Sequence, residues 1–155
     1  MKTAIILLSI LISAQFLEAK TRIPTEKKLL SDATTIVIAE FSSYSEKPES
    51  FYKIQKAVFQ VVEVVKGDSI KAVTIGGSTQ PICASNVMFT GKEKGRYLLL
   101  LRQEGDLYYP VDGYSGMIPI KDGKVDWFIQ GSEETISRER KPLDLELVIK
   151  KIKKA

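Results

Sequence analysis

A run of four leucines, Leu98–Leu101, places the strongest constraint on how this chain can fold. Gly95, Arg96 and Tyr97 precede the run and Arg102 follows it, so the apolar segment is short and has a charged residue near each end. Its length suits a strand rather than a helix, and a strand that is apolar on both faces has to be buried on both faces. We therefore predict a central, fully buried strand over 95–102.

Six other segments carry strand patterns, with turn residues between several of them. They are residues 34–41, 51–65, 72–75, 107–111, 117–120 and 124–128. Asp112-Gly113 and Asp122-Gly123 are hairpin signals. In 51–65 both parities are apolar, which predicts a bend or bulge. Pro110 and Pro119 predict that their strands are edges or carry bulges, because proline lacks the N–H that a ladder needs.

Two helices are expected, one on each side of the strands. Pro24–Ala33 reads as a short helix with proline in its first turn. Pro142–Lys153 reads as a basic amphipathic helix, with Leu145, Val148 and Ile152 on its apolar stripe. Strands at this spacing predict a mainly β protein, a closed or nearly closed antiparallel barrel of five to seven strands.

The first 19 residues have the order of a secretory signal peptide. Lys2 precedes an apolar run, and the segment ends with the small residue Ala19. Cleavage after Ala19 is expected, with Ala14 as the weaker option. The apolar run is shorter than the roughly 20 residues of a membrane span. We expect a secreted or periplasmic protein in which residues 20–155 form one domain, without a membrane span.

Cys83 is the only cysteine. It cannot form a disulfide within one chain, so two interpretations stay open. We favour a small buried apolar side chain. The alternative is an intermolecular disulfide; otherwise the protein is expected to be a monomer.

The net charge of +4 is concentrated at the C-terminal end of the chain. Residues 138–154 hold seven lysines and arginines against three acids, so the rest of the chain is close to neutral. A basic segment of this kind can bind anionic lipid, polysaccharide or nucleic acid. The solvated face of a terminal helix is the simpler interpretation. With a neutral body, an exported protein is not expected to bind nucleic acid.

The chain contains no histidine. This excludes catalysis by Ser-His-Asp or Cys-His groups and every zinc site built on imidazole. We therefore predict a protein that is not an enzyme, without catalytic residues, cofactor or bound metal. Carboxylates alone leave one alternative, an extracytoplasmic enzyme acting on polysaccharide. Its candidate carboxylates are Asp106, Asp112, Asp122 and Asp126, for which roles in turns or on a strand surface are the simpler interpretation. Asp112 and Asp122 could separately form a calcium site, although the spacing of an EF-hand is not present.

Tyrosines are the candidate ligand-binding residues. Tyr109 and Tyr114 flank turns, and Tyr52 stands beside the first long loop. Barrels of this kind bind extended ligands on aromatic, basic faces. The partner expected here is an unknown protein or an extracellular polymer.

The order of several motifs resembles a known family. The motifs are Asp32–Ala39, Phe59–Gly67, the loop around Cys83, Gly95–Leu101, Gly116–Ile120 and Asp122-Gly123. In this order they resemble the tissue-inhibitor-of-metalloproteinase/netrin-like modules, in particular secreted bacterial relatives. The resemblance covers residues 29–128. It implies a five-stranded Greek-key barrel of the oligonucleotide/oligosaccharide-binding (OB) type, without enzymatic activity.

The resemblance does not extend to protease inhibition. Inhibitors of this family hold the protease zinc with the amine and carbonyl of an N-terminal cysteine that signal cleavage exposes. Here the expected mature chain begins Lys20-Thr21-Arg22, and Cys83 lies far downstream. The family's disulfides are also missing. We therefore expect the fold of these modules without their inhibitory mechanism.

Overall fold

The computed structural model of the chain describes residues 25–47, 54–78, 87–128 and 140–155. The expected signal peptide, 1–19, lies outside this part. The described part contains eight strands, two α-helices and one 3₁₀ turn. In chain order these are α2 (Glu26–Asp32), β1 (Thr35–Tyr44), β2 (Gln55–Lys66), β3 (Ala72–Gly77), β4 (Arg96–Glu104), β5 (Leu107–Pro110), η1 (Gly113–Gly116), β6 (Met117–Lys121), β7 (Lys124–Phe128), β8 (Arg140–Asp144) and α3 (Leu145–Ile152).

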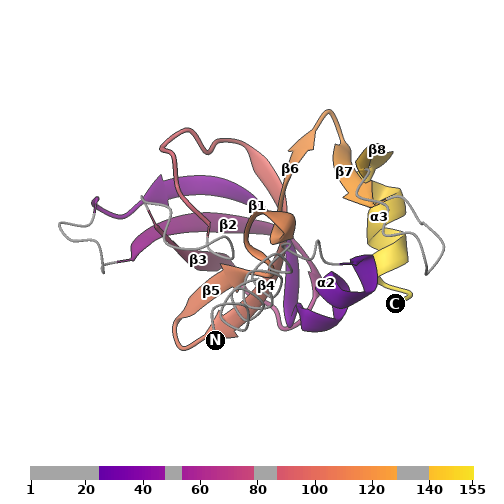
Figure 1. Cartoon of the computed structure of the whole chain (residues 1–155), viewed down its shortest axis with the longest axis horizontal. Coiled ribbons are helices and arrows are strands. Elements are labelled where there is room, and N and C mark those ends of the chain that lie inside the picture. The colour runs from indigo at the N-terminus through magenta and orange to yellow at the C-terminus, as the bar shows by residue number, and fades with distance from the viewer. Residues whose placement is uncertain (1–24, 48–53, 79–86, 129–139) are drawn as a thin grey trace, which may run out of the picture.

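All eight strands belong to one sheet, in the order β1-β2-β3-β5-β4-β6-β7-β8 (Figure 1). An additional pairing between β1 and β4 turns β1–β5 into a partial ring of five strands. One contact in this ring, between Ile75 on β3 and Tyr108 on β5, is parallel. The other pairings between the eight strands are antiparallel, as predicted, and this contact is the exception. The reason is geometric, because strand directions cannot alternate all the way around a ring with an odd number of strands.

The leucine run lies on β4 as a fully buried strand, as predicted, with each of its four leucines 0% exposed. Alternate residues face two different cores. Leu99 and Leu101 lie inside the ring with Phe59, in what we call the ring core. Leu98 and Leu100 lie on the opposite side, in a helix-side core that contains Trp127. Burying each leucine contributes about 1.5–3 kcal/mol, so β4 stabilises both cores.

Pairing between β1 and β2 is irregular, as the two apolar parities of 51–65 predicted. The register shifts between Ile36 and Val37, between Ile38 and Ala39, and again near the end of β1. At the second shift an extra residue of β2, Val62, is left without a partner on β1. Val62 is 54% exposed, because its neighbour Val61 packs against the ring core and successive side chains along a strand point to opposite faces.

Strand β6 leads from the ring to a smaller unit made of β7, β8 and α3 (Figure 1). The first part of β6 pairs with β4, where Pro119 stands opposite Tyr97. The next residue, Ile120, pairs instead with Val125 on β7. Pro119 was expected to mark an edge or a bulge, and it lies where β6 exchanges one partner strand for the other.

The predicted helix over 142–153 begins later than expected. Pro142 and its neighbours form β8, in which Pro142 stands opposite Asp126 of β7, and α3 starts at Leu145. Proline is tolerated in β8 because this strand lies at the end of the sheet order and has only one partner strand. The backbone N–H of Leu145 donates to the Gly123 carbonyl at 2.9 Å, which fixes the start of the helix beside the β6–β7 turn.

Helix α2 covers the helix-side core from the other end of the chain. Thr25 caps it, with its hydroxyl oxygen accepting a hydrogen bond from the Lys28 N–H at 3.2 Å. Leu29 is buried and Leu30 is partly buried. Neither α2 nor α3 has the length and apolarity to cross a lipid bilayer.

Candidate functional site

The outer surface of the ring carries a row of four residues that crosses four strands. Lys56 on β2 stands opposite Gly76 on β3, and Tyr109 on β5 stands opposite Arg102 on β4. On each of the four strands, a residue directly next to the row member packs in or against the ring core. Successive side chains along a strand point to opposite faces of the sheet. The four positions therefore face outward. We call them the tyrosine row.

Gly76 makes room for the ring of Tyr109. A methyl group at position 76 would lie 2.7 Å from Cε1 and 2.9 Å from the hydroxyl oxygen of Tyr109. Carbon atoms do not approach so closely, so only glycine lets the ring lie against β3 at this point. Tyr109 is therefore half-buried and is positioned by the sheet rather than by a loop.

The pKa of the Tyr109 phenol is raised, chiefly by burial. Burial raises the pKa of the Tyr109 hydroxyl, Glu104 raises it further, and Arg102 acts in the opposite direction. A neutral phenol can donate a hydrogen bond to a ligand. The Arg102 guanidinium lies 3.2 Å from the Glu104 carboxylate, and both side chains are about half exposed. Exposed pairs of this kind are weak, so Arg102 can exchange Glu104 for another anion.

Tyr114, the second predicted ligand-binding residue, is about half exposed, and its hydroxyl is hydrogen-bonded within the protein. Its O–H donates to the Met88 carbonyl at 2.5 Å and accepts from the Met88 N–H at 3.0 Å. Met88 is the bridge partner of Ser78, which follows β3 directly. Tyr114 thus approaches the same end of β3 as Tyr109, with 52% of its surface exposed. Tyr52 and Cys83, the remaining predictions, lie outside the described residues.

The four aspartates of the carboxylate alternative lie at turns and on one strand. Asp106 is in the β4–β5 turn, Asp122 in the β6–β7 turn, Asp112 just before η1 and Asp126 on β7, and all four are exposed. Asp112 and Asp122 adopt left-handed backbone conformations with φ of 52° and 50°. Aspartate is one of the few residues that tolerate this conformation, which explains both in tight turns. Within the described ranges, no group of three or more Cys, Asp or Glu side chains is arranged to hold a metal ion.

Sequence reasoning found Tyr109 but not the other members of its row. Lys56 and Arg102 belong to distant segments, and only the sheet register brings them onto one line. The strand predicted over 72–75 extends further in the structure, and Gly76 and Gly77 are its last two residues. A methyl group at Gly77 would meet the Phe89 ring at 2.5 Å, just as one at Gly76 would meet Tyr109. The two adjacent glycines at the end of this apolar strand were therefore the sequence feature that could have indicated aromatic rings packed against the strand.

Comparisons with protein-family models, curated proteins and solved structures give no match to this chain. The resemblance to the tissue-inhibitor-of-metalloproteinase/netrin-like modules therefore stays a prediction from the sequence.

Proposed function

We propose that this chain is a secreted, non-catalytic binding domain whose tyrosine row binds an anionic extracellular polymer. The observation that carries the proposal is that the Tyr109 ring packs against Gly76, with Lys56 and Arg102 as the other members of the row. A fixed aromatic ring can stack on the apolar face of a sugar, and the two cations suit its acidic groups. Because a row across four strands is extended, it suits a polymer better than a compact ligand.

We also infer that the five-strand ring is a Greek-key barrel of the OB type. Three features support this inference, namely the order β1-β2-β3-β5-β4, the return pairing of β1 with β4, and the parallel contact of β3 with β5. Barrels of this type bind oligonucleotides and oligosaccharides on the face around their second and third strands. Two members of the tyrosine row, Lys56 and Gly76, lie on β2 and β3.

Export and the lack of catalysis are supported by the sequence. Residues 1–19 have the order of a signal peptide, and N-terminal sequencing of exported protein is expected to begin at Lys20. A chain without histidine has no imidazole to move protons at neutral pH. A binding role needs no such group.

Affinity electrophoresis tests the proposal directly. The purified protein is run through native gels that contain either polygalacturonate, which is anionic, or dextran, which is neutral. We expect polygalacturonate alone to retard the protein. Tyr109→Ala is expected to weaken the interaction about fivefold, the effect of losing ~1 kcal/mol of ring contact. Arg102→Gln and Lys56→Gln should each weaken it as well.

Lys92→Gln is the matched control for Arg102→Gln and Lys56→Gln, because this exposed lysine lies outside the row. Equal retardation of Tyr109→Ala and the wild type would overturn the proposal. If the protein bound no polymer but was crosslinked to a protein in the exported fraction, its ligand would be that protein and not a polymer. Release of new reducing ends from polygalacturonate would show cleavage of the polymer, and the carboxylate-dependent enzyme would then be the correct function.

A further inference from the structure

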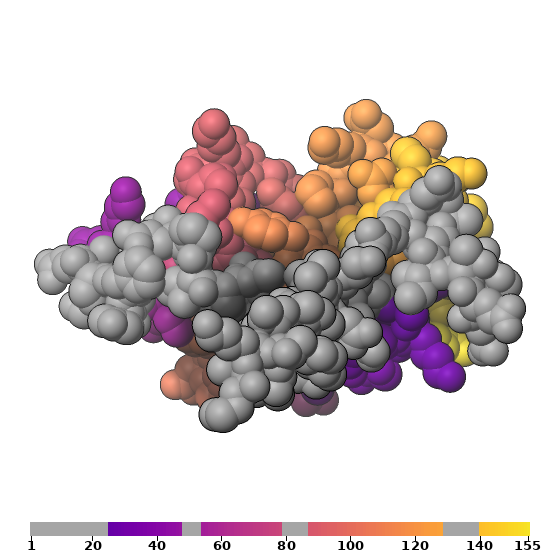
Figure 2. All heavy atoms as spheres, in the orientation of Figure 1, coloured from indigo at the N-terminus to yellow at the C-terminus, as the bar shows by residue number. Residues whose placement is uncertain are grey.

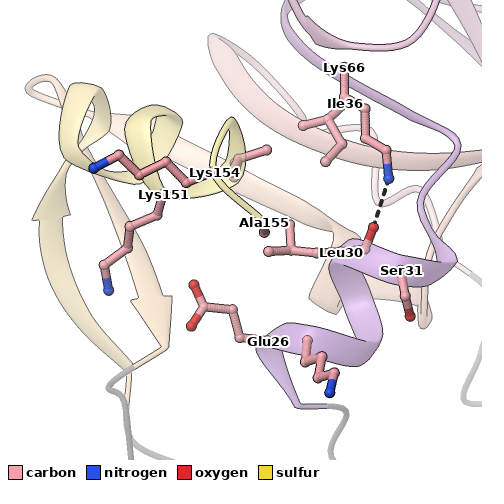
Figure 3. A pocket seen from close by; sticks show the side chains of 10 residues that line it. Glu26, Leu30, Ser31, Ile36, Lys66, Lys151, Lys154 and Ala155 are labelled. Atoms are coloured by element: carbon pink, nitrogen blue, oxygen red, sulfur yellow. Dashed lines mark hydrogen bonds between the residues drawn. The ribbon is translucent and has the colours of Figure 1, made fainter.

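A groove lies on the helix side of the molecule, between α2 and the last turn of α3. Figure 2 shows the atoms of both helices at the same end of the molecule. The groove between them measures about 630 Å³ and is lined by residues of both helices, together with Ile36 of β1 and Lys66 of β2 (Figure 3). This is within the range of about 300–1,000 Å³ that small-molecule sites occupy. It shares no residue with the tyrosine row.

The groove has an apolar floor. Ile36 and Ile152 are buried in the helix-side core, and Leu30 packs against that core while remaining partly exposed. These three side chains come from three separate elements, β1, α3 and α2, that meet at this point. Of the three, Leu30 keeps partial exposure to water, so an aliphatic ligand in the groove would cover its apolar surface above the two buried isoleucines.

The polar lining of the groove is predominantly cationic. Four lysines line it, namely Lys27, Lys66, Lys151 and Lys154, against one side-chain carboxylate, Glu26. In the described part of the chain, no ion pair joins Lys27, Lys151 or Lys154 to a carboxylate. Their neighbour Lys153, by contrast, lies 3.6 Å from Glu63. The groove thus presents cations that an anionic ligand can use.

Two of the charged groups in the groove are held by the protein. The Lys66 ammonium donates to the carbonyl oxygens of Leu30 at 2.9 Å and Ala33 at 2.8 Å, across the C-terminal end of α2. The Glu26 carboxylate accepts a 2.6 Å hydrogen bond from the indole N–H of Trp127. Figure 3 shows Glu26 and Leu30 on the α2 side of the groove and Lys151 and Lys154 on the α3 side.

We propose that this groove binds a free long-chain alkanoate, with its aliphatic chain on the apolar floor and its carboxylate among the lysines. An apolar floor with a cationic rim is complementary to a molecule that has an apolar body and one anionic end. A compact anion would leave the floor uncovered. A flat membrane surface would reach the rim without entering a concave groove.

The test uses dodecanoate at neutral pH, below its critical micelle concentration, with dodecyltrimethylammonium as the cationic ligand of equal chain length. Isothermal titration calorimetry measures affinity. Emission from Trp127, the only tryptophan, reports events at the groove through its hydrogen bond to Glu26. We expect saturable binding of dodecanoate with a shift in emission, and no such response to the cationic ligand.

Two variants localise the binding. Lys151→Gln/Lys154→Gln is expected to weaken dodecanoate binding about tenfold, as two exposed charge contacts are lost. Ser31→Glu, which places a carboxylate on the lining of the groove, should weaken it too. Lys71→Gln/Lys92→Gln removes the same charge from exposed positions elsewhere and should bind like the wild type.

Three results would overturn the proposal. They are equal binding of the two ligands, equal binding by the wild type and Lys151→Gln/Lys154→Gln, and association with anionic phospholipid vesicles in the absence of dodecanoate binding. None of them bears on the tyrosine row, since its variants and its polymer are different.

Discussion

The indole N–H of Trp127 donates a 2.6 Å hydrogen bond to Glu26 Oε1, which joins β7 to the first turn of α2 across 101 residues of sequence. Trp127 is fully buried and packs edge-on against Phe128, with the ring centroids 5.8 Å apart. A buried indole N–H has to find an acceptor within the protein. Glu26 supplies it, so the acidic residue at the start of α2 attaches this helix to the β7 strand.

Glu26→Ala is expected to reduce the free energy of unfolding by about 1–3 kcal/mol, because it leaves the buried indole N–H without its acceptor. Glu26→Gln keeps an acceptor oxygen and should cost less. Urea denaturation followed by far-ultraviolet circular dichroism measures both. Lys27→Ala changes the exposed neighbour and should stay within about 0.5 kcal/mol of the wild type. Equal losses for Glu26→Ala and Lys27→Ala would show that the hydrogen bond contributes little.

The central strand was predictable because its signal is local. Leu98–Leu101 is apolar on both parities, and no pairing partner has to be known to infer burial on both faces. The sequence does not reveal which core each leucine enters. That depends on β1, whose pairing with β4 sets Val37 opposite Leu99 and places the ring on one side and the helices on the other.

Strand β8 and the tyrosine row could not be predicted, because both depend on pairing between distant segments. In β8 only Leu143 is even partly buried, so the sequence shows no alternating apolar pattern. Its extended form follows from five paired positions along β7. Proline was instead interpreted as the first turn of a helix, which is its other common position.

Gly116→Ala is expected to destabilise the protein by about 3 kcal/mol or more, at or above the upper end of overpacking costs. The added carbon would lie 2.6 Å from both the backbone nitrogen and the carbonyl oxygen of Val111, and 2.7 Å from the Leu100 carbonyl oxygen. These backbone atoms cannot move apart easily, since the Val111 N–H donates to the Leu100 carbonyl at 2.9 Å. The melting temperature and the urea midpoint should both fall.

Gly105→Ala is the control for that substitution. Gly105 has a φ of 60° and nothing within 4 Å of the position of an added carbon, so alanine meets only the left-handed backbone penalty of about 1–2 kcal/mol. If both alanine variants lost the same stability, steric overlap at Gly116 would not be the cause.

Glu93 organises the loop before β4 and attaches it to β1. Its carboxylate accepts hydrogen bonds from the backbone N–H and hydroxyl of Thr90, both at 2.9 Å, and from the Gly91 N–H at 3.1 Å. The Tyr44 hydroxyl donates to it as well and accepts from the Glu93 N–H at 3.0 Å. Burial disfavours the charged carboxylate, but these hydrogen bonds together outweigh it and lower the pKa of Glu93 below its usual value.

The lowered pKa gives the protein a specific loss of stability in acid. Below about pH 4.3 an unfolded glutamate takes up its proton, while the native Glu93 carboxylate is still charged. The unfolded state then binds more protons than the native state, so the free energy of unfolding decreases as the pH is lowered. Glu93→Gln cannot titrate, so its stability deficit relative to the wild type is expected to be largest near neutral pH. The deficit should shrink as the pH falls through the native pKa. Urea unfolding across this range measures it, with Glu46→Gln, at an exposed carboxylate, as the control that changes stability little. A deficit that stayed constant down to the acid limit would mean that Glu93 is held by packing alone.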